Sequence, residues 1–108
     1  MTFKVHMLAN HDPYCIREVV IPDTAQVTDE TSQATLLDLV FYYGQNEFQP
    51  LRDRYSVSCG DVIELHDGSL HVVASVGFKQ ISPEQFEKYK LMERLDRSFA
   101  GYTGIWDV

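Results

Sequence analysis

Cysteine, long apolar runs and positive charge are all scarce in this sequence, and each shortage excludes a class of protein. Its 108 residues include two cysteines, Cys15 and Cys59, and no Cys-x-x-Cys pair, which argues against a zinc knuckle or a thioredoxin-like redox motif. We expect both thiols to be reduced and half-buried. The longest uninterrupted apolar run, Leu39 to Tyr43, is far shorter than the roughly 20 residues that cross a bilayer. Because no targeting segment is visible, we expect a cytoplasmic protein that does not enter a membrane.

Positive charge is outweighed by negative charge. Nine Lys and Arg stand against sixteen Asp and Glu, which gives a net charge of −7. This balance argues against general nucleic-acid binding, since neutralisation of phosphates supplies most of that affinity. Residues 5–50 contain one basic residue, Arg17, against seven acidic ones. Such a region is either a docking face for a basic partner or a device for solubility.

Motifs for catalysis are missing as well. The glycines form neither a phosphate-binding loop nor a dinucleotide fingerprint, and no Gly-x-Ser-x-Gly segment is present. The sequence therefore predicts no catalytic residue, no metal, no cofactor and no enzymatic activity.

Apolar residues are abundant enough for one core. They make up 44% of the chain, and thirteen residues are aromatic (six Phe, six Tyr and one Trp), which excludes disorder of the whole chain. We expect one domain over residues 1–97. Residues 98–108 form an aromatic C-terminal tail that contains Tyr102 and Trp106, and we expect it to fold back on the core.

The apolar periodicity predicts an α+β fold. Alternation over residues 2–9 and 14–21 indicates two strands of an antiparallel hairpin, and a helix is expected over 32–43, with Thr31 or Ser32 as N-cap and Gly44 after its end. A second hairpin is expected over 62–76, followed by a turn and a short extended piece at 77–81. Ser82 and Gln85 then form a capping box for a helix over 83–96. The predicted order is ββα-ββα, an antiparallel sheet of two hairpins with two helices.

The second hairpin carries the first candidate site. Asp67-Gly68 predicts a two-residue turn, which would place Glu64 opposite His71 on a solvated face that also contains His66. A carboxylate and two imidazoles are metal ligands, but a polar hairpin face is equally typical of a solvated surface. The pattern favours a solvated polar face, and any binding role that these three residues have is expected to be contact with a ligand or partner rather than with a metal.

Residues 56–81 resemble a known family. They read Ser-Val-Ser-Cys-Gly-Asp-Val-Ile-Glu-Leu-His-Asp-Gly and then, after a hairpin, Val-Gly-Phe-Lys-Gln-Ile. This segment is similar to the YodL-like family of small domains from Gram-positive bacteria, their phages and conjugative elements. The residues that match the family's pattern are Ser56, Ser58, Gly60, Asp61, Val62, Ile63, Leu65, Gly77, Phe78, Lys79 and Ile81. The resemblance implies an accessory protein of a mobile element and no assigned chemistry.

Two functions follow from these observations. The first is a non-enzymatic, acidic interaction domain that binds another protein through the acidic N-terminal half and the tail around Tyr102 and Trp106. The alternative is RNA binding, because Ser-Val-x-x-Gly-Asp-Val-Ile also resembles ASCH and PUA-like barrels, which bind RNA or modified bases. That function would use Arg52, Arg54 and Lys79.

Overall fold

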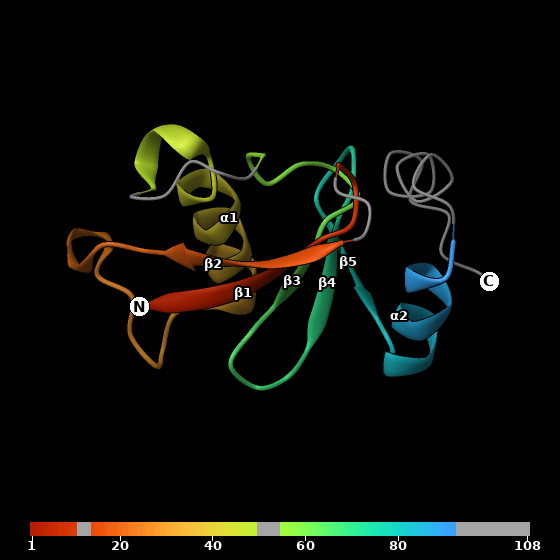
Figure 1. Ribbon diagram of the computed structural model, residues 1–108. Coiled ribbons are helices and arrows are strands. Elements are labelled where there is room, and N and C mark those ends of the chain that lie inside the picture. The colour runs from red at the N-terminus through yellow and green to blue at the C-terminus, as the bar shows by residue number, and fades with distance from the viewer. Residues whose placement is uncertain (11–13, 50–54, 93–108) are drawn as a thin grey trace.

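The predicted antiparallel sheet is present, and it has five strands. The computed structural model describes residues 1–10, 14–49 and 55–92, and every statement below concerns these residues. The strands follow the order β2-β1-β3-β4-β5 across the sheet, and each neighbouring pair is antiparallel (Figure 1). Their bounds are β1 Thr2–Met7, β2 Cys15–Val20, β3 Val62–Glu64, β4 Leu70–Val73 and β5 Phe78–Ile81.

The element order is ββα-βββα rather than the predicted ββα-ββα. The extended piece after the second hairpin is a full strand, β5, which pairs with β4 along its whole length. Gly77 makes this possible, since its φ of 73° lies in the left-handed region that favours glycine. The amide of Ala74 donates to the carbonyl of Gly77 at 3.0 Å and closes the turn.

The first helix, α1, covers Gln33–Tyr43 and begins as predicted. The Ser32 hydroxyl accepts the amide of Thr35 at 3.2 Å, so Ser32 is the N-cap. Gly44 ends the helix with a φ of −72°, which any residue can adopt. A Cβ there would lie 2.8 Å from the carbonyl oxygen of Val40 and against the side chain of Val57. Glycine is therefore needed for close packing, not for a left-handed backbone.

The second helix, α2, covers Pro83–Lys90. The capping box is confirmed: the Ser82 hydroxyl accepts the Gln85 amide at 3.1 Å, and the Gln85 side chain accepts the Ser82 amide at 2.9 Å. The predicted length is wrong, because the helix ends at Lys90 with Leu91 as its C-cap, whereas it was expected to continue to residue 96. Two short 3₁₀ helices, η1 over Asp23–Ala25 and η2 over Asn46–Phe48, flank α1 in the sequence.

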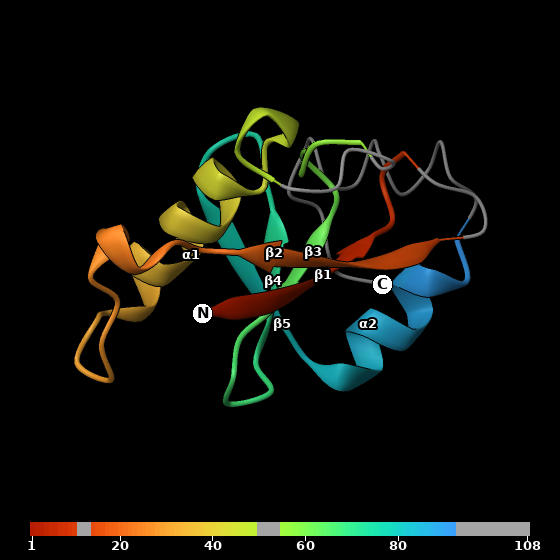
Figure 2. The ribbon, with the colours of Figure 1, turned by 60° about the vertical axis from the view of Figure 1, so that its left-hand side comes forward.

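The sheet is packed on both faces. Helix α1 covers one face and α2 the other, as the two views of the ribbon show (Figures 1 and 2). The core on the α1 side contains Phe3, Val5, Met7, Val19, Ile21, Leu37, Val40, Val57, Ile63, Leu65 and Val73. The core on the α2 side contains Leu8, Val62, Leu70, Val72, Ile81, Phe86 and Tyr89. The predicted solvated face of the second hairpin is therefore wrong: its residues are divided between the two faces, with Val62 on the α2 side and Val73 on the α1 side, and all four residues of β4 are buried.

The register of the β3–β4 hairpin also differs from the prediction by one residue. Ile63 lies opposite His71, and Glu64 lies opposite Leu70. The turn holds three residues instead of two: the Leu65 amide donates to the Ser69 carbonyl at 3.0 Å, and Gly68, at a φ of 85°, donates back to Leu65. A shift of one residue turns every side chain to the other face, so Glu64 and His71 lie on opposite sides of the sheet.

Three remaining expectations concern the cysteines, the tail and the membrane. Cys15 and Cys59 are free thiols and half-buried, as predicted. The tail over 98–108 lies outside the described residues. None of the helices in the described ranges has the length and apolar character needed to cross a membrane.

Candidate functional site

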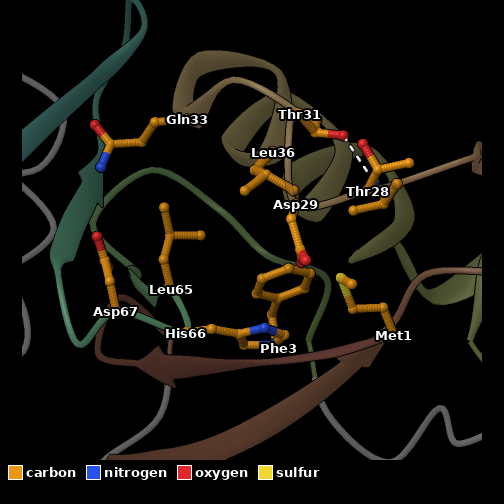
Figure 3. A pocket seen from close by; sticks show the side chains of 11 residues that line it. Met1, Phe3, Thr28, Asp29, Thr31, Gln33, Leu36, Leu65, His66 and Asp67 are labelled. Atoms are coloured by element: carbon orange, nitrogen blue, oxygen red, sulfur yellow. Dashed lines mark hydrogen bonds between the residues drawn. The ribbon is translucent and has the colours of Figure 1, made fainter.

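A pocket of about 290 Å³ opens between the tip of the β3–β4 hairpin and the loop that precedes α1. We call it the hairpin–loop pocket (Figure 3). It combines an apolar floor with a polar rim, and His66 is the one predicted site residue in it. The lining residues are Met1, Phe3, Val27, Thr28, Asp29, Thr31, Gln33, Leu36, Leu65, His66 and Asp67.

Two stacked rings form part of the floor. The imidazole of His66 lies on the ring of Phe3 with 4.3 Å between centroids and 13° between planes. Nε2 of His66 lies 2.8 Å from the carbonyl oxygen of Thr2. Because a carbonyl only accepts, Nε2 carries the proton and donates it. Phe3 belongs to the buried core, so the stack fixes the exposed imidazole to the rigid end of β1.

Asp67 forms the rim on the hairpin side. Its Oδ1 accepts the amide of Ser69 at 2.9 Å and the Ser69 hydroxyl at 2.6 Å. These two bonds, the hydroxyl first, hold the pKa of Asp67 below its ordinary value. Asp67 is therefore ionised at neutral pH, and Oδ2 is left for a ligand.

Ser69 links Asp67 to His71. The Ser69 oxygen lies 2.8 Å from Nε2 of His71. Since the hydroxyl proton goes to Asp67, Nε2 of His71 must donate to the Ser69 oxygen. The chain therefore runs His71 to Ser69 to Asp67, with serine in the middle, whereas a catalytic triad places histidine there to accept the serine proton. This arrangement fixes the hairpin tip and does not activate a nucleophile.

Asp29 forms the rim on the loop side. The turn that carries it is held by Thr28 and Thr31: the Thr28 amide donates to Oγ1 of Thr31 at 2.9 Å, and the Thr31 amide donates to the Thr28 carbonyl at 3.1 Å. Figure 3 shows the Asp29 carboxylate reaching into the pocket above the stacked rings of Phe3 and His66. Two carboxylates, from opposite sides, thus border one apolar floor.

The other predicted site residues lie elsewhere. His71 is buried on the α1 side, where desolvation lowers its pKa against the opposing charge of Asp67. It lines a separate cavity of about 380 Å³ beside α1. Lys79 is exposed on β5 and lines neither cavity, although its neighbours Phe78 and Gln80 line the second one. The remaining candidates, Arg52, Arg54, Tyr102 and Trp106, lie outside the described residues.

Glu64 pairs with a histidine that the sequence did not single out as its partner. On the α2 side of the sheet, Oε1 of Glu64 lies 3.0 Å from Nε2 of His6. The His6 ring is buried and meets the edge of Phe86 at 4.9 Å between centroids. Among the described residues, Nδ1 of His6 has no hydrogen-bond partner. Neither residue reaches the hairpin–loop pocket.

Asp61 is a buried acid that the sequence marked only as part of a turn. Its Oδ1 accepts the amide of Ala9 at 3.0 Å, and its Oδ2 accepts the amide of Ser58 at 2.8 Å. Burial raises the pKa of Asp61 from the ordinary 3.8 to about 6, although these amides oppose the shift. Asp61 ties the end of β1 to the turn before β3 and thereby has a structural role.

The described residues contain no group of three or more His, Cys, Asp or Glu arranged to hold a metal ion. Searches of protein-family models, of curated proteins and of solved structures found no match for this chain. The sequence offered no signal for Asp29, since the fold alone brings the loop before α1 to the hairpin tip.

Proposed function

We propose that this protein is a non-enzymatic, cytoplasmic binding domain that recognises a basic segment of a partner protein, with a lysine or arginine side chain of that segment in the hairpin–loop pocket. The observation that carries the proposal is the pair of carboxylates, Asp29 and Asp67, on opposite rims of an apolar floor. Two lining residues of the described chain carry basic groups, and both donate to the backbone: the Met1 ammonium to the Ile21 carbonyl at 3.1 Å, and Nε2 of His66 to the Thr2 carbonyl.

The chemistry of the pocket matches a long cationic side chain. Lysine and arginine carry three or four methylene groups beneath a charged head, and they bury the stem against apolar surface while the head stays polar. Leu36, Leu65 and the Phe3 ring supply that apolar surface. The carboxylates of Asp29 and Asp67 then meet the head group with charge-assisted hydrogen bonds.

The volume favours a side chain over a metabolite. Pockets for small molecules typically measure about 300–1,000 Å³, and this one, at about 290 Å³, is at the lower end of that range. A single side chain from a partner fits this space without a closed cavity.

The charge of the surrounding surface supports a basic partner. The described segment 14–49 contains one basic residue, Arg17, and six acidic residues. Arg17 is buried, with 6% of its surface exposed, and donates to Asn46 and to the carbonyl of Tyr55. The exposed charge of this segment is therefore entirely negative, which raises the encounter rate with a basic partner.

A peptide titration tests the proposal. End-blocked hexalysine is titrated into the protein by calorimetry, with Asp29→Asn and Asp67→Asn as pocket variants. Each variant is expected to weaken binding by about two- to fivefold, the range for one partly exposed ion pair. Glu30→Gln is the matched control, because Glu30 is an exposed neighbour of Asp29 outside the pocket.

The control decides between the pocket and general attraction. If Glu30→Gln weakens binding as much as Asp29→Asn does, the affinity comes from net charge and the pocket has no part in it. No binding of hexalysine at low salt would also contradict the proposal. Binding of RNA in the same buffer, by a gel shift, would instead favour the alternative that uses Arg52, Arg54 and Lys79.

The resemblance of residues 56–81 to the YodL-like family supports a role as an accessory protein of a phage or conjugative element. The partner would then be a protein of that element or of its host. Genes for replication, conjugation or phage assembly beside this one would support that role, and a neighbourhood of unrelated metabolic genes would contradict it.

A further inference from the structure

Two aromatic rings stack on the surface at the C-terminal end of α1. Tyr42, near the end of α1, and Phe48, in η2, lie with 4.8 Å between ring centroids and 25° between planes. Tyr42 is 54% exposed and Phe48 is 41% exposed. The ring of Tyr43 meets both edge-on and supports them from the side of the core. We call Tyr42 and Phe48 the aromatic platform.

The backbone beneath the aromatic platform is held firmly. Gln49, itself buried, accepts the amide of Val20 at 2.9 Å and donates to the carbonyls of Val20 and Tyr43. The guanidinium of Arg17 donates to the side chain of Asn46 at 2.6 Å. A surface that is already fixed loses little conformational entropy when it binds.

The exposed charge beside the platform, within the described residues, is negative, because the nearby guanidinium of Arg17 is buried and held by Asn46 and the Tyr55 carbonyl. Asp38 is exposed one helical turn before Tyr42, and residues four apart lie on the same face of a helix. The faces of aromatic rings are themselves negative, so rings and carboxylate together attract a cation. The exposed fractions of both rings show that the described part of the chain leaves them partly uncovered.

We propose that the aromatic platform binds the guanidinium of an arginine in the partner's basic segment, by stacking on the outer face of the Tyr42 ring, which Phe48 supports from the other side. This inference rests on the proposed function, since it assigns a second contact to the same partner. Arginine is favoured over lysine because the planar guanidinium stacks on aromatic rings, whereas the ammonium is a compact and strongly hydrated point charge. The platform and the hairpin–loop pocket lie at opposite ends of α1, so a substitution can remove the contacts of one and leave those of the other in place.

The test compares two peptides on three variants. End-blocked hexaarginine and hexalysine are titrated by calorimetry into the wild type, Tyr42→Ala and Tyr42→Phe. Tyr42→Ala is expected to weaken the binding of hexaarginine by about two- to fivefold, the range for one exposed cation–π contact, and to change that of hexalysine by less than about twofold. Tyr42→Phe keeps the ring and is expected to bind hexaarginine as the wild type does.

Two results would overturn the inference. Equal losses for the two peptides in Tyr42→Ala would show that the platform does not recognise guanidinium, and so would an unchanged affinity for hexaarginine. Tyr55→Ala is the matched control, because it removes an exposed tyrosine that is not part of the stack. Failure of the proposed function would be seen in a different measurement: Asp29→Asn and Glu30→Gln would weaken the binding of hexalysine equally.

Discussion

Asp61 gives the sharpest quantitative test of the structure. It is fully buried, accepts the amides of Ala9 and Ser58, and has its pKa raised from 3.8 to about 6 by burial. The folded state therefore binds the Asp61 proton more tightly than the unfolded state does. The free energy of unfolding should rise as the pH falls from 6 towards 3.8, and that gain is lost as the pH rises through 6.

The size of the effect follows from the two pKa values. With 3.8 for the unfolded and about 6 for the folded state, ionisation of Asp61 lowers the free energy of unfolding by about 3 kcal/mol at pH 7 and by about half that at pH 5. Asp61→Asn cannot titrate. The stability of the wild type relative to this variant should therefore be greater at pH 5 than at pH 7 by about 1 kcal/mol.

Urea denaturation of both proteins at pH 5 and pH 7 measures this difference. Every other ionisable residue is the same in both proteins, so the remaining contributions cancel. Asp38→Asn, which removes an exposed carboxylate, is the control and should give no such change. If the difference in the free energy of unfolding between wild type and Asp61→Asn is the same at both pH values, the claim that burial raises the pKa of Asp61 is refuted. Should Asp61→Asn not fold, a carboxyl-carbon NMR titration of the wild type must show a midpoint near 6.

Two further predictions concern the segment after α1. Gln49→Ala removes the acceptor of the Val20 amide and the two bonds that Gln49 donates to the carbonyls of Val20 and Tyr43. The free energy of unfolding should fall by about 2–4 kcal/mol. An unchanged midpoint of urea denaturation would show that these bonds are absent in solution. Gly44→Ala forces a Cβ against Val57 and should lower the free energy of unfolding by about 1–3 kcal/mol, measured by thermal denaturation, whereas a variant as stable as the wild type would contradict the close packing.

The strands and helix starts could be predicted because they depend on local signals. Alternation marked β1 and β2, and the hydroxyls of Ser32 and Ser82 marked the starts of both helices. The register of the β3–β4 hairpin was missed because Asp67-Gly68 suits a two-residue turn as well as a three-residue one. Because the register differs by one residue, His71 lies in the core beneath α1 and not on the expected solvated face.

The pocket was harder to foresee than the fold. Asp29 and His66 are far apart in the sequence, and each alone is an ordinary surface residue. They meet because β1 lies between β2 and β3, which brings the loop after β2 and the tip of the β3–β4 hairpin to the same end of the sheet. Such a juxtaposition depends on strand order, which neither alternation nor caps reveal. The predicted solvated face of the hairpin was wrong for a related reason, since the sequence did not show that α1 and α2 would cover both faces of the sheet.

An NMR titration with Nα-acetyl-lysine amide tests the central claim most directly. If the hairpin–loop pocket takes a cationic side chain, the amide signals of residues 27–33 and 65–67 should shift together, those of α2 should stay in place, and the shifts should shrink at 1 M salt. Shifts spread evenly over the acidic surface, or confined to residues outside the pocket, would contradict the account.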